Sequence, residues 1–572
     1  MEETPDFDVI VVGSGMSGGW VAKEMCERGL KVCILDRGTP TDPTTDYSDN
    51  LDPWDRQYFD RVRPDVLERD FGIQDGNYYA VRESNRHFWM TDTAQPYEQA
   101  EGTRFKWRRG ATVGGRSLMW GRASWRLAPY DFEANAADGE GVDWPVRYDD
   151  IAPWYDHVEK FAGICGNRDG LDQVPDGEHL LPPFEHTAAE LDFKSRMGDA
   201  FDNCHLIVGR YAHLTKPTEE HMALGRGKCQ ARTRCEHGCS FGAYFSAVSA
   251  TLPAAERTGN LTLLTGKVAS QVVHDPNTNR VTGVRVVDAN TGAGETYTAR
   301  TVFLNASTIG TALILLNSAT EAQPTGLANR SDQVGRNLMD HFGGSLVAAA
   351  VPGIDDSTVF GRRPAHAYIP RYRNFPARDQ KGYKRAWGYQ VYSGRWGWSG
   401  DRPGVGADYK AANRTPGEWS IMLDAFGEVL PHADNRVTAH KTRTDKWGQP
   451  IAVINFEVRD NDRALMDAAH ADAVELFRRA GYADIREYRK PEVELANGIG
   501  GRIHEMGTAR MGRDPETSVL NGFNQAHDIP NLFITDGSFM GSSGVVNPSL
   551  TYMAFSARAA NHAADLMEEG VI

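Results

Sequence analysis

The chain has 572 residues, which is too long for one ordinary hydrophobic core, so we expect two large domains or one domain with large insertions. Its formal net charge of −15 at pH 7 argues against nucleic acid or an anionic membrane as a partner, because phosphate groups would be repelled over most of the surface. No apolar run approaches the roughly 18 residues that a membrane-spanning helix needs, so we expect no membrane span.

Residues 9–38 predict a strand, a helix and a second strand that together bind a dinucleotide. An apolar run leads into three glycines, a helix-permissive segment follows, and a second apolar run ends in an acid. The first glycine permits a tight turn, the second lets the backbone approach a pyrophosphate, the third lets the helix pack on the strand, and the acid accepts from a ribose hydroxyl. The alternative is a purely structural turn. These positions are Gly13, Gly15, Gly18 and Asp36.

The first strand is predicted to begin near Asp8, which leaves no room before it for an export signal, so we expect none. The chain has seven cysteines, which is not the pattern of a disulfide framework. Cys26 and Cys33 fall inside the first strand-helix-strand unit and are predicted to be small core residues.

After this unit, residues 39–57 are rich in Pro, Asp and Thr and predict turns and irregular backbone. Residues 108–125 are dense in glycine and lack a helical period. Gly110, Gly114 and Gly115 would let backbone amides approach a planar or anionic ligand closely. The alternative for this segment is a glycine-rich surface loop.

The middle of the chain predicts a helix and then a sheet. Residues 143–163 carry apolar residues at helical spacing after Tyr148, Asp149 and Asp150, which indicates a capped helix. Residues 261–305 predict a β-meander, and its last strand runs into a helix near residues 309–316.

Residues 343–494 change character, with strand-like runs such as SLVAAAV, WGYQVY, WSIMLDAF and AVINFEV. The amphipathic helix predicted at 461–480 would back an antiparallel sheet, a composition that suits a substrate domain. Residues 530–537 predict another buried strand. Asn547 is predicted to cap a terminal helix that reaches Met567, with Pro548 in its first turn.

Four separated segments resemble the glucose-methanol-choline (GMC) family of FAD-dependent oxidoreductases: VVGSGMSGG, GATVGGRSLMWGR, GRNLMDHFGG, and HEMGTARMG with TDGSFMGSSGVVNPSLTYMA. The resemblance implies an α/β fold with a bipartite, Rossmann-like FAD-binding domain and an inserted α+β substrate domain built on an antiparallel sheet. It places residues 1–45, 100–125, 225–342 and 495–572 in the FAD-binding domain, and residues 46–99, 126–224 and 343–494 in the substrate domain and insertions.

The family motifs also imply roles for individual residues. The ADP half of the cofactor is held by the first glycines and acid, the flavin is approached by the second glycine segment, and the ribityl-pyrophosphate is held near the C-terminus. The cofactor-binding residues that follow are Gly13, Gly15, Gly18, Asp36, Gly110, Val113, Gly114, Gly115, Ser117, Val268, Ala306, Asp536 and Gly537.

The two catalytic positions of the family match His504 and Asn547, and the Asn-Pro form resembles the sugar-oxidising pyranose oxidase branch. A neutral imidazole can take the hydroxyl proton while the flavin N5 takes the hydride, and the amide can donate to the substrate oxygen. If the side chain of Asn547 caps the helix, it cannot also donate a hydrogen bond to the substrate. The branch member that links FAD covalently has His just before the Trp of the glycine loop. Here Met119 stands before Trp120, so a noncovalent FAD is expected.

Three cysteines, Cys229, Cys235 and Cys239, lie close together in the sequence, and only His237 is at hand as a fourth ligand. Their spacing matches no standard zinc site. The segment resembles the one that carries a three-cysteine iron-sulfur cluster in bacterial GMC glucose dehydrogenases, with one more residue between the first two cysteines. A disulfide, another metal and free structural cysteines are the alternatives.

The resemblance is strongest to bacterial glucoside 3-dehydrogenases, which oxidise a ring hydroxyl of glucose or glycosides, here expected at C3, to a keto-sugar. It implies a small electron-transfer or export subunit and a cytochrome acceptor as partners. The compartment is then cytoplasmic unless the folded chain is exported with such a subunit to the periplasm. Two alternatives stay open: a pyranose or C-glycoside oxidase that uses dioxygen and releases hydrogen peroxide, and a non-catalytic FAD-binding subunit.

Overall fold

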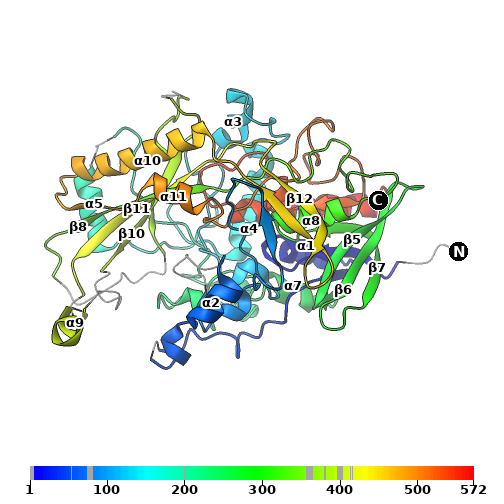
Figure 1. Ribbon diagram of the computed structural model, residues 1–572, viewed down its shortest axis with the longest axis horizontal. Coiled ribbons are helices and arrows are strands. Elements are labelled where there is room, and N and C mark those ends of the chain that lie inside the picture. Colours follow the sequence, from blue (N-terminus) through cyan, green and yellow to red (C-terminus); the bar gives the residue numbers. More distant parts are fainter. Residues whose placement is uncertain are drawn as a thin grey trace.

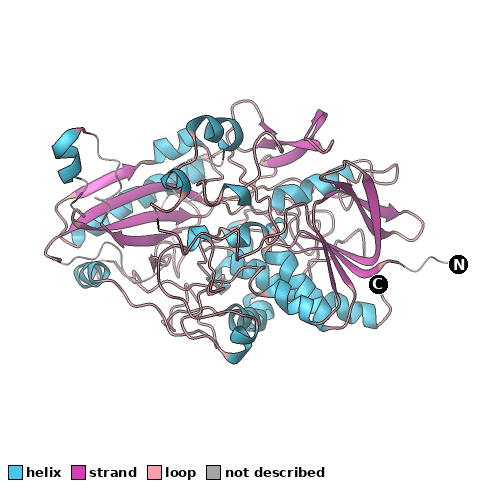
Figure 2. Ribbon diagram, turned by 90° about the horizontal axis from the view of Figure 1, so that it is seen from below, coloured by secondary structure: helices cyan, strands magenta, loops and turns pink. Residues whose placement is uncertain are grey.

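The computed structural model describes residues 5–52, 54–73, 81–198, 201–355, 365–378, 382–395, 404–412, 414 and 416–572. Two large sheets lie toward opposite ends of the long axis (Figure 1). Loops and helices fill the space between the two groups of strands, as a view from below shows (Figure 2). The site described below is built from the segments that connect these two sheets.

A seven-stranded sheet carries the N-terminal unit. In spatial order its strands are β4 (Leu261–Leu264), β2 (Val32–Leu35), β1 (Phe7–Val12), β7 (Gly294–Leu304), β6 (Arg280–Asp288) and β5 (Lys267–Asp275), and β15 (Leu532–Ile534) also pairs with β7. β7 spans two sub-sheets, since its first half pairs antiparallel with β6 and its second half pairs parallel with β1 and β15. The predicted β-meander is confirmed for β5, β6 and β7, whereas β4, which the prediction included, pairs parallel with β2.

Helices with small side chains pack tightly around this sheet. α1 (Met16–Glu27) contacts α7 (Thr251–Arg257) and α12 (Ser549–Glu568), and α12 contacts α4 (Tyr148–Ala162). All residues of α1 from Ser17 to Cys26 are buried, because helices cover it on several sides. Cys26 and Cys33 are core residues, as predicted.

The second large sheet is antiparallel, with five strands in the order β14 (Ile485–Arg489), β8 (Phe342–Val351), β11 (Trp419–Gly427), β10 (Trp387–Gly394) and β9 (Ala367–Ile369). α10 (Asp460–Arg479) packs on β8 and β11, and α5 (Ala188–Met197) packs on β8, β10 and β11. The predicted apolar face of α10 is buried, so the antiparallel sheet backed by a helix is confirmed.

One predicted strand belongs to a different sheet. The run AVINFEV, expected in the large antiparallel sheet, forms β13 (Pro450–Asn455), which pairs antiparallel with β12 (Arg436–Thr444) and parallel with β3 (Tyr97–Gln99). Alternating polarity shows that a strand has one buried face, but it does not say which sheet the strand joins. β12 directly precedes β13 in the chain, whereas β3 lies more than 300 residues earlier.

The remaining described helices are α2 (Pro64–Phe71), α3 (Pro129–Asp138), α6 (Glu219–Ala223), α8 (Thr308–Asn317), α9 (Gly406–Ala412) and α11 (Pro491–Asn497). The predicted helices near residues 143–163 and 309–316 are thus confirmed as α4 and α8. Within the described residues, no helix combines the length and apolar character needed to cross a bilayer. The residue boundaries of the two expected domains stay a prediction.

Candidate active site

A cavity of about 1140 Å³ runs between the two large sheets. Typical ligand pockets enclose about 300 to 1,000 Å³, so this cavity has room for a dinucleotide and a further small molecule. Its walls come from the N-terminal glycine loop, the glycine segment near residue 115, the start of α8, strands β10 and β11, and the C-terminal segments near residues 504, 536 and 547.

The loop between β1 and α1 has the backbone geometry that the glycine pattern predicts. Gly13 has φ +97°, and a Cβ there would lie 2.4 Å from the carbonyl oxygen of Asn305. A Cβ on Gly18 would lie 1.9 Å from the carbonyl oxygen of Gly13. Gly15 is different, because a Cβ there would meet nothing closer than 3.8 Å, and the residue lines the cavity. Gly13 and Gly18 therefore serve the turn and the packing of α1, and Gly15 leaves the backbone open to a ligand.

Asp36 follows β2 and lines the cavity beside this loop. Its carboxylate accepts hydrogen bonds from the backbone N–H of Ser14 at 2.8 Å and of Gly38 at 2.6 Å. Each carboxylate oxygen has two lone pairs, so capacity remains for a hydroxyl group. Asp36 thus joins the ends of β1 and β2 and presents an acceptor to the cavity.

The second glycine segment packs directly on the first. Gly114 has φ +83°, and its N–H donates to Ser14 Oγ at 2.8 Å. A Cβ on Gly115 would lie 3.7 Å from the Cα of Gly15, so the two loops form one continuous wall. Gly110, Gly115 and Ser117 line the cavity, as predicted for residues near the cofactor.

Two predicted cofactor contacts in this segment lie behind the cavity wall. Val113 is buried in the core that also contains Val9 and Val11, and Gly114 packs against the side chain of Val248. Neither residue lines the cavity. That these two residues approach the flavin stays a prediction; Gly114, with φ +83°, turns the chain at this point.

The C-terminal part of the wall comes from residues just after β15. Asp536 is buried and accepts from Thr311 Oγ1 at 2.5 Å and from the backbone N–H of Ser538 at 3.0 Å. Burial raises the pKa of its carboxyl group. A Cβ on Gly537 would lie 2.4 Å from the carbonyl oxygen of Glu505, so this position also needs glycine. The predicted residues that line this part of the cavity are Val268, Ala306, Asp536 and Gly537.

These features fit the FAD that the family implies. The N-terminus of α1 opens on the cavity with no acidic side chain in its first turn, so its free N–H groups can receive a pyrophosphate. The open face of Gly15 lets the cofactor approach the backbone, and Asp36 stands where the ribose of a dinucleotide would lie. The residues present are therefore those that would hold FAD.

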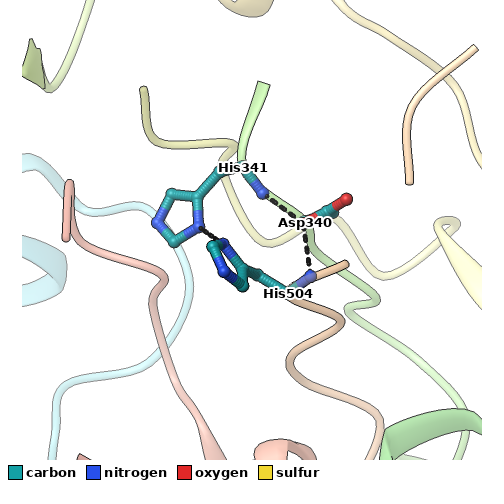
Figure 3. Close-up of side chains that lie close together, drawn as sticks. All are labelled: Asp340, His341 and His504. Carbon is teal, nitrogen blue, oxygen red and sulfur yellow. Dashed lines mark hydrogen bonds between the residues drawn. The ribbon is translucent and has the colours of Figure 1, made fainter. Parts of the chain in front are cut away.

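His504 lies on the wall between the dinucleotide loops and the antiparallel sheet. Its backbone N–H donates to Asp340 Oδ1 at 3.0 Å, and its Nδ1 lies 3.2 Å from His341 Nδ1 (Figure 3). Burial, with the nearby His341, Arg502 and Arg116, holds the pKa of His504 well below its usual value. The imidazole is therefore neutral at physiological pH, which is the state a general base needs.

Asn547 faces His504 instead of capping a helix. α12 begins at Ser549 after Pro548, and no side chain caps it, so the predicted role of Asn547 as N-cap was wrong. The amide Nδ2 lies 3.5 Å from His504 Nε2, and the amide Oδ1 accepts from Gln390 Nε2 at 3.4 Å. The residue is one position too early for the cap, because Pro548 comes between it and the helix. Its amide is thus available to a substrate.

The predicted fourth ligand of the cysteine loop is engaged elsewhere. The two ring nitrogens of His237 contact Arg56 Nη1 at 2.9 Å and Ser84 Oγ at 3.0 Å. A different imidazole approaches one of these thiols, since His213 Nδ1 lies 3.6 Å from Cys229 Sγ. His213 stands 16 residues earlier in the chain, so its approach to Cys229 was not visible in the spacing.

The three clustered cysteines are partly exposed and unpaired. In the part of the chain that the structure describes, their sulfur atoms do not all lie within 4.8 Å of one another, so they do not surround a single ion. Burial raises the pKa of Cys235 to about 12, and Arg122 opposes that rise. Cys235 lines the same cavity as His504, which connects the cysteine loop to the candidate active site.

Sequence reasoning missed several residues of the site. His341 stands in the GRNLMDHFGG segment, where a second histidine in a motif was a signal. Gln390 and Tyr392 lie in a predicted strand two positions apart, so they share one face, and two polar residues on that face were a further signal. Asp424 and Arg502 also line the cavity and form an ion pair with a distance of 2.6 Å, which no local pattern could reveal.

Comparison with known proteins agrees with this arrangement. The N-terminal pattern of the GMC oxidoreductases matches residues 7–343, and their C-terminal pattern matches residues 431–556. The chain is 30% identical to 2-methyl-1,2-propanediol dehydrogenase of Mycolicibacterium austroafricanum, covering 97% of this chain and 94% of that protein. It is 26% identical to the fructose dehydrogenase large subunit of Gluconobacter japonicus, with 99% of each covered. Paromamine 6'-oxidase of Streptomyces fradiae is 27% identical, with 97% and 90% covered.

Among solved structures, pyridoxine 4-oxidase from Mesorbium loti has a TM-score of 0.62 to this chain, with 18% identity and 97% and 99% of the two chains covered. Identity this low shows the fold alone. Together with the matched patterns, it confirms the predicted α/β fold with a dinucleotide-binding part and a substrate part.

Proposed function

The chain belongs to the GMC oxidoreductase family, and on that premise we propose that it is an FAD-dependent sugar dehydrogenase. It oxidises a ring hydroxyl of a sugar or glycoside, at C3, to a keto-sugar and passes the electrons to a partner acceptor. The observation that carries the proposal is the pairing of His504 and Asn547 on the cavity wall, with 3.5 Å between the imidazole Nε2 and the amide Nδ2.

The two side chains have different roles in the oxidation of an alcohol. The neutral imidazole of His504 takes the hydroxyl proton at Nε2. The amide of Asn547 donates to the substrate oxygen as negative charge develops there. FAD, when bound, supplies the acceptor for the hydride that leaves the same carbon. Both groups therefore act on one hydroxyl.

The substrate end of the cavity is rich in hydrogen-bonding groups, which suits a polyhydroxylated ring. Besides the catalytic pair it presents amide, hydroxyl, imidazole and carboxylate groups from β10, from β11 and from the residues just before α5 and β9. The fructose dehydrogenase and paromamine 6'-oxidase similarities support a substrate of this class. The polar lining residues are Thr187, His366, Gln390, Tyr392, Ser393 and Asp424.

For the route of the electrons, we propose an iron-sulfur cluster on Cys229, Cys235 and Cys239 and a small partner subunit. Cys235 lines the cavity, and burial, together with the charge of the neighbouring thiol of Cys239, raises the pKa of both Cys229 and Cys235. Segment 47–60 contacts this loop through the Arg56–His237 hydrogen bond, and its described part exposes Trp54 and Phe59. The name of the fructose dehydrogenase large subunit supports a multi-subunit arrangement.

FAD is proposed to be noncovalent, since Met119 lines the cavity where covalent attachment would need histidine. After acid precipitation the flavin should remain in the supernatant. Iron analysis and an absorbance spectrum of anaerobically purified protein test the cluster, and Cys235→Ser should keep FAD but lose the iron. Protein that contains no iron would contradict this part of the proposal.

The second candidate function is an oxidase, which the similarity to paromamine 6'-oxidase favours. Anaerobic bleaching of the flavin by a panel of sugars and glycosides tests the substrate class, and product analysis identifies the oxidised carbon. Stoichiometric hydrogen peroxide under air would identify the oxidase. If no sugar or glycoside bleaches the flavin, the sugar dehydrogenase proposal is wrong.

A further inference from the structure

The imidazole of His341 connects His504 to the backbone of the C-terminal segment. Its Nε2 lies 3.0 Å from the carbonyl oxygen of Gly544, and its Nδ1 lies 3.2 Å from His504 Nδ1 (Figure 3). The ring of His341 is 1% exposed and packs on Phe426 with 4.2 Å between ring centroids. Both ring nitrogens of His341 are thus fixed in place.

These contacts determine where the protons lie. The carbonyl oxygen of Gly544 can only accept, so His341 Nε2 must carry a hydrogen. Burial lowers the pKa of His341 to about 3, so the ring is neutral and its Nδ1 carries a lone pair. His504 Nδ1 must then donate to it, and the neutral ring of His504 keeps its lone pair on Nε2.

The contacts on the opposite side of His504 also place the lone pair of the ring on Nε2. The hydroxyl of Tyr392 donates to Gln390 Oε1 at 2.9 Å, and Gln390 Nε2 donates to Asn547 Oδ1 at 3.4 Å. This fixes the amide of Asn547 so that Nδ2, a donor, faces His504 Nε2, which must therefore be the acceptor. Two independent sets of contacts assign the lone pair to the same nitrogen.

Resting on the proposed function, we propose that His341 is a positioning residue that sets the tautomer of His504. It holds the proton on Nδ1 and so leaves Nε2, the nitrogen that faces Asn547, as the base. His341 itself does not touch the substrate. Without it, the proton of His504 could move to Nε2, and the ring would then present a donor where the reaction needs an acceptor.

A bound cation is the competing explanation of the same cluster, because Asp340, His341 and His504 offer ligand atoms within 4.8 Å of one another. The hydrogen bonds of Asp340 favour the explanation by a fixed tautomer of His504 over a bound cation. Asp340 Oδ1 already accepts from the backbone N–H groups of His341 at 2.8 Å and of His504 at 3.0 Å, so the carboxylate holds the two histidines in position.

The test compares two variants of nearly equal size, His341→Asn and His341→Leu. Both lose the hydrogen bond to Gly544, but asparagine keeps an oxygen acceptor near the position of Nδ1. We expect the anaerobic flavin reduction rate to fall about 10- to 100-fold in His341→Leu, the usual cost of losing an orienting partner of a histidine. His341→Asn should retain most of the rate, and FAD content and KM should change little in both.

A second measurement determines the position of the proton on His504 by NMR. In the FAD-loaded wild-type protein labelled with [15N]histidine, the signal that disappears in His504→Ala should show a protonated Nδ1 and an unprotonated Nε2. In His341→Leu the same ring should show a mixture of tautomers. This readout reports the proton position directly and does not depend on the identity of the substrate.

The outcomes separate the two hypotheses. Equal rates in the Asn and Leu variants, a protonated Nε2 in the wild type, or a stoichiometric divalent metal whose removal changes the rate would each overturn the role of His341. If instead His504→Ala leaves the rate unchanged, the proposed catalytic function is wrong, whatever the tautomer.

Discussion

The two ends of the cavity are built in different ways. At the dinucleotide end closely packed backbone shapes the cavity. At Gly13, Gly18 and Gly537 an added Cβ would lie within 2.4 Å of a carbonyl oxygen. At the substrate end side chains form the site, and hydrogen bonds of 3.2 to 3.5 Å orient His504 and Asn547. Damage to the first end should therefore remove the cofactor, whereas damage to the second should only slow the reaction.

The largest effect should come from Gly18→Ala, where the new Cβ would lie 1.9 Å from the carbonyl oxygen of Gly13. Overpacking of this kind costs about 1 to 3 kcal/mol or more, because backbone atoms must move. We expect little folded, FAD-loaded protein, measured by the melting temperature and the ratio of flavin to protein absorbance. Gly15→Ala is the matched control, since its Cβ has 3.8 Å of space. It should fold normally with weaker FAD binding, and equal damage in both variants would contradict the comparison.

The second effect concerns the base at the substrate end. His504→Ala should lower the flavin reduction rate by about 10² to 10⁴, the usual contribution of a positioned acid-base group. FAD content should be nearly unchanged, because the glycine loops that hold the cofactor do not depend on this side chain. Anaerobic stopped-flow measures the rate. His440→Ala, which lies outside the cavity wall, should behave as wild type. A fall of less than about threefold would show that another group takes the proton.

A slightly smaller effect is expected at the amide. Asn547→Ala removes the donor to the substrate oxygen and should lower the rate by about 10² to 10³, the usual cost of one such donor. Asn547→Asp has nearly the same shape but presents a negative charge, so it should be at least as slow. If the Asp variant keeps the wild-type rate, the amide does not stabilise charge on the substrate.

The smallest effect is a shift of the pH profile. Burial and nearby positive charge lower the pKa of His504, so its neutral, proton-accepting form persists below the usual histidine pKa of about 6.5. The titratable and charged groups beside it are His341, Arg502 and Arg116, which lower its pKa, and Asp340, whose own pKa burial raises to about 7. The acid limb of kcat/KM should therefore lie below pH 6.5. An acid limb above that value would mean that His504 is less buried in the working enzyme or is not the base.

The contrast between the backbone-built end and the side-chain-built end of the cavity also explains which predictions could be made from local sequence. Residues 9–38 could be interpreted correctly because a strand-helix-strand unit is local, and because Gly13 and Gly18 occupy backbone positions where a Cβ would collide with a carbonyl oxygen. The antiparallel sheet in residues 343–494 followed from the strand-like runs and from the amphipathic helix at 461–480. The assignment of β13 to a third sheet did not follow, because its partner β3 lies more than 300 residues away.

For the candidate site, the sequence indicated the residues that we propose as catalytic, and the tertiary structure decided how they are oriented. His504 and Asn547 were found through their motifs, but the motif that contains Asn547 also suggested a helix cap, which the chain direction at Pro548 rules out. The contacts of His341 with His504 and of Gln390 with Asn547 join residues 163 and 157 positions apart. Hydrogen-bond direction depends on such distant pairs. Local sequence therefore indicated the proposed base and its partner, and only the packing of the two sheets fixed which nitrogen of His504 faces Asn547.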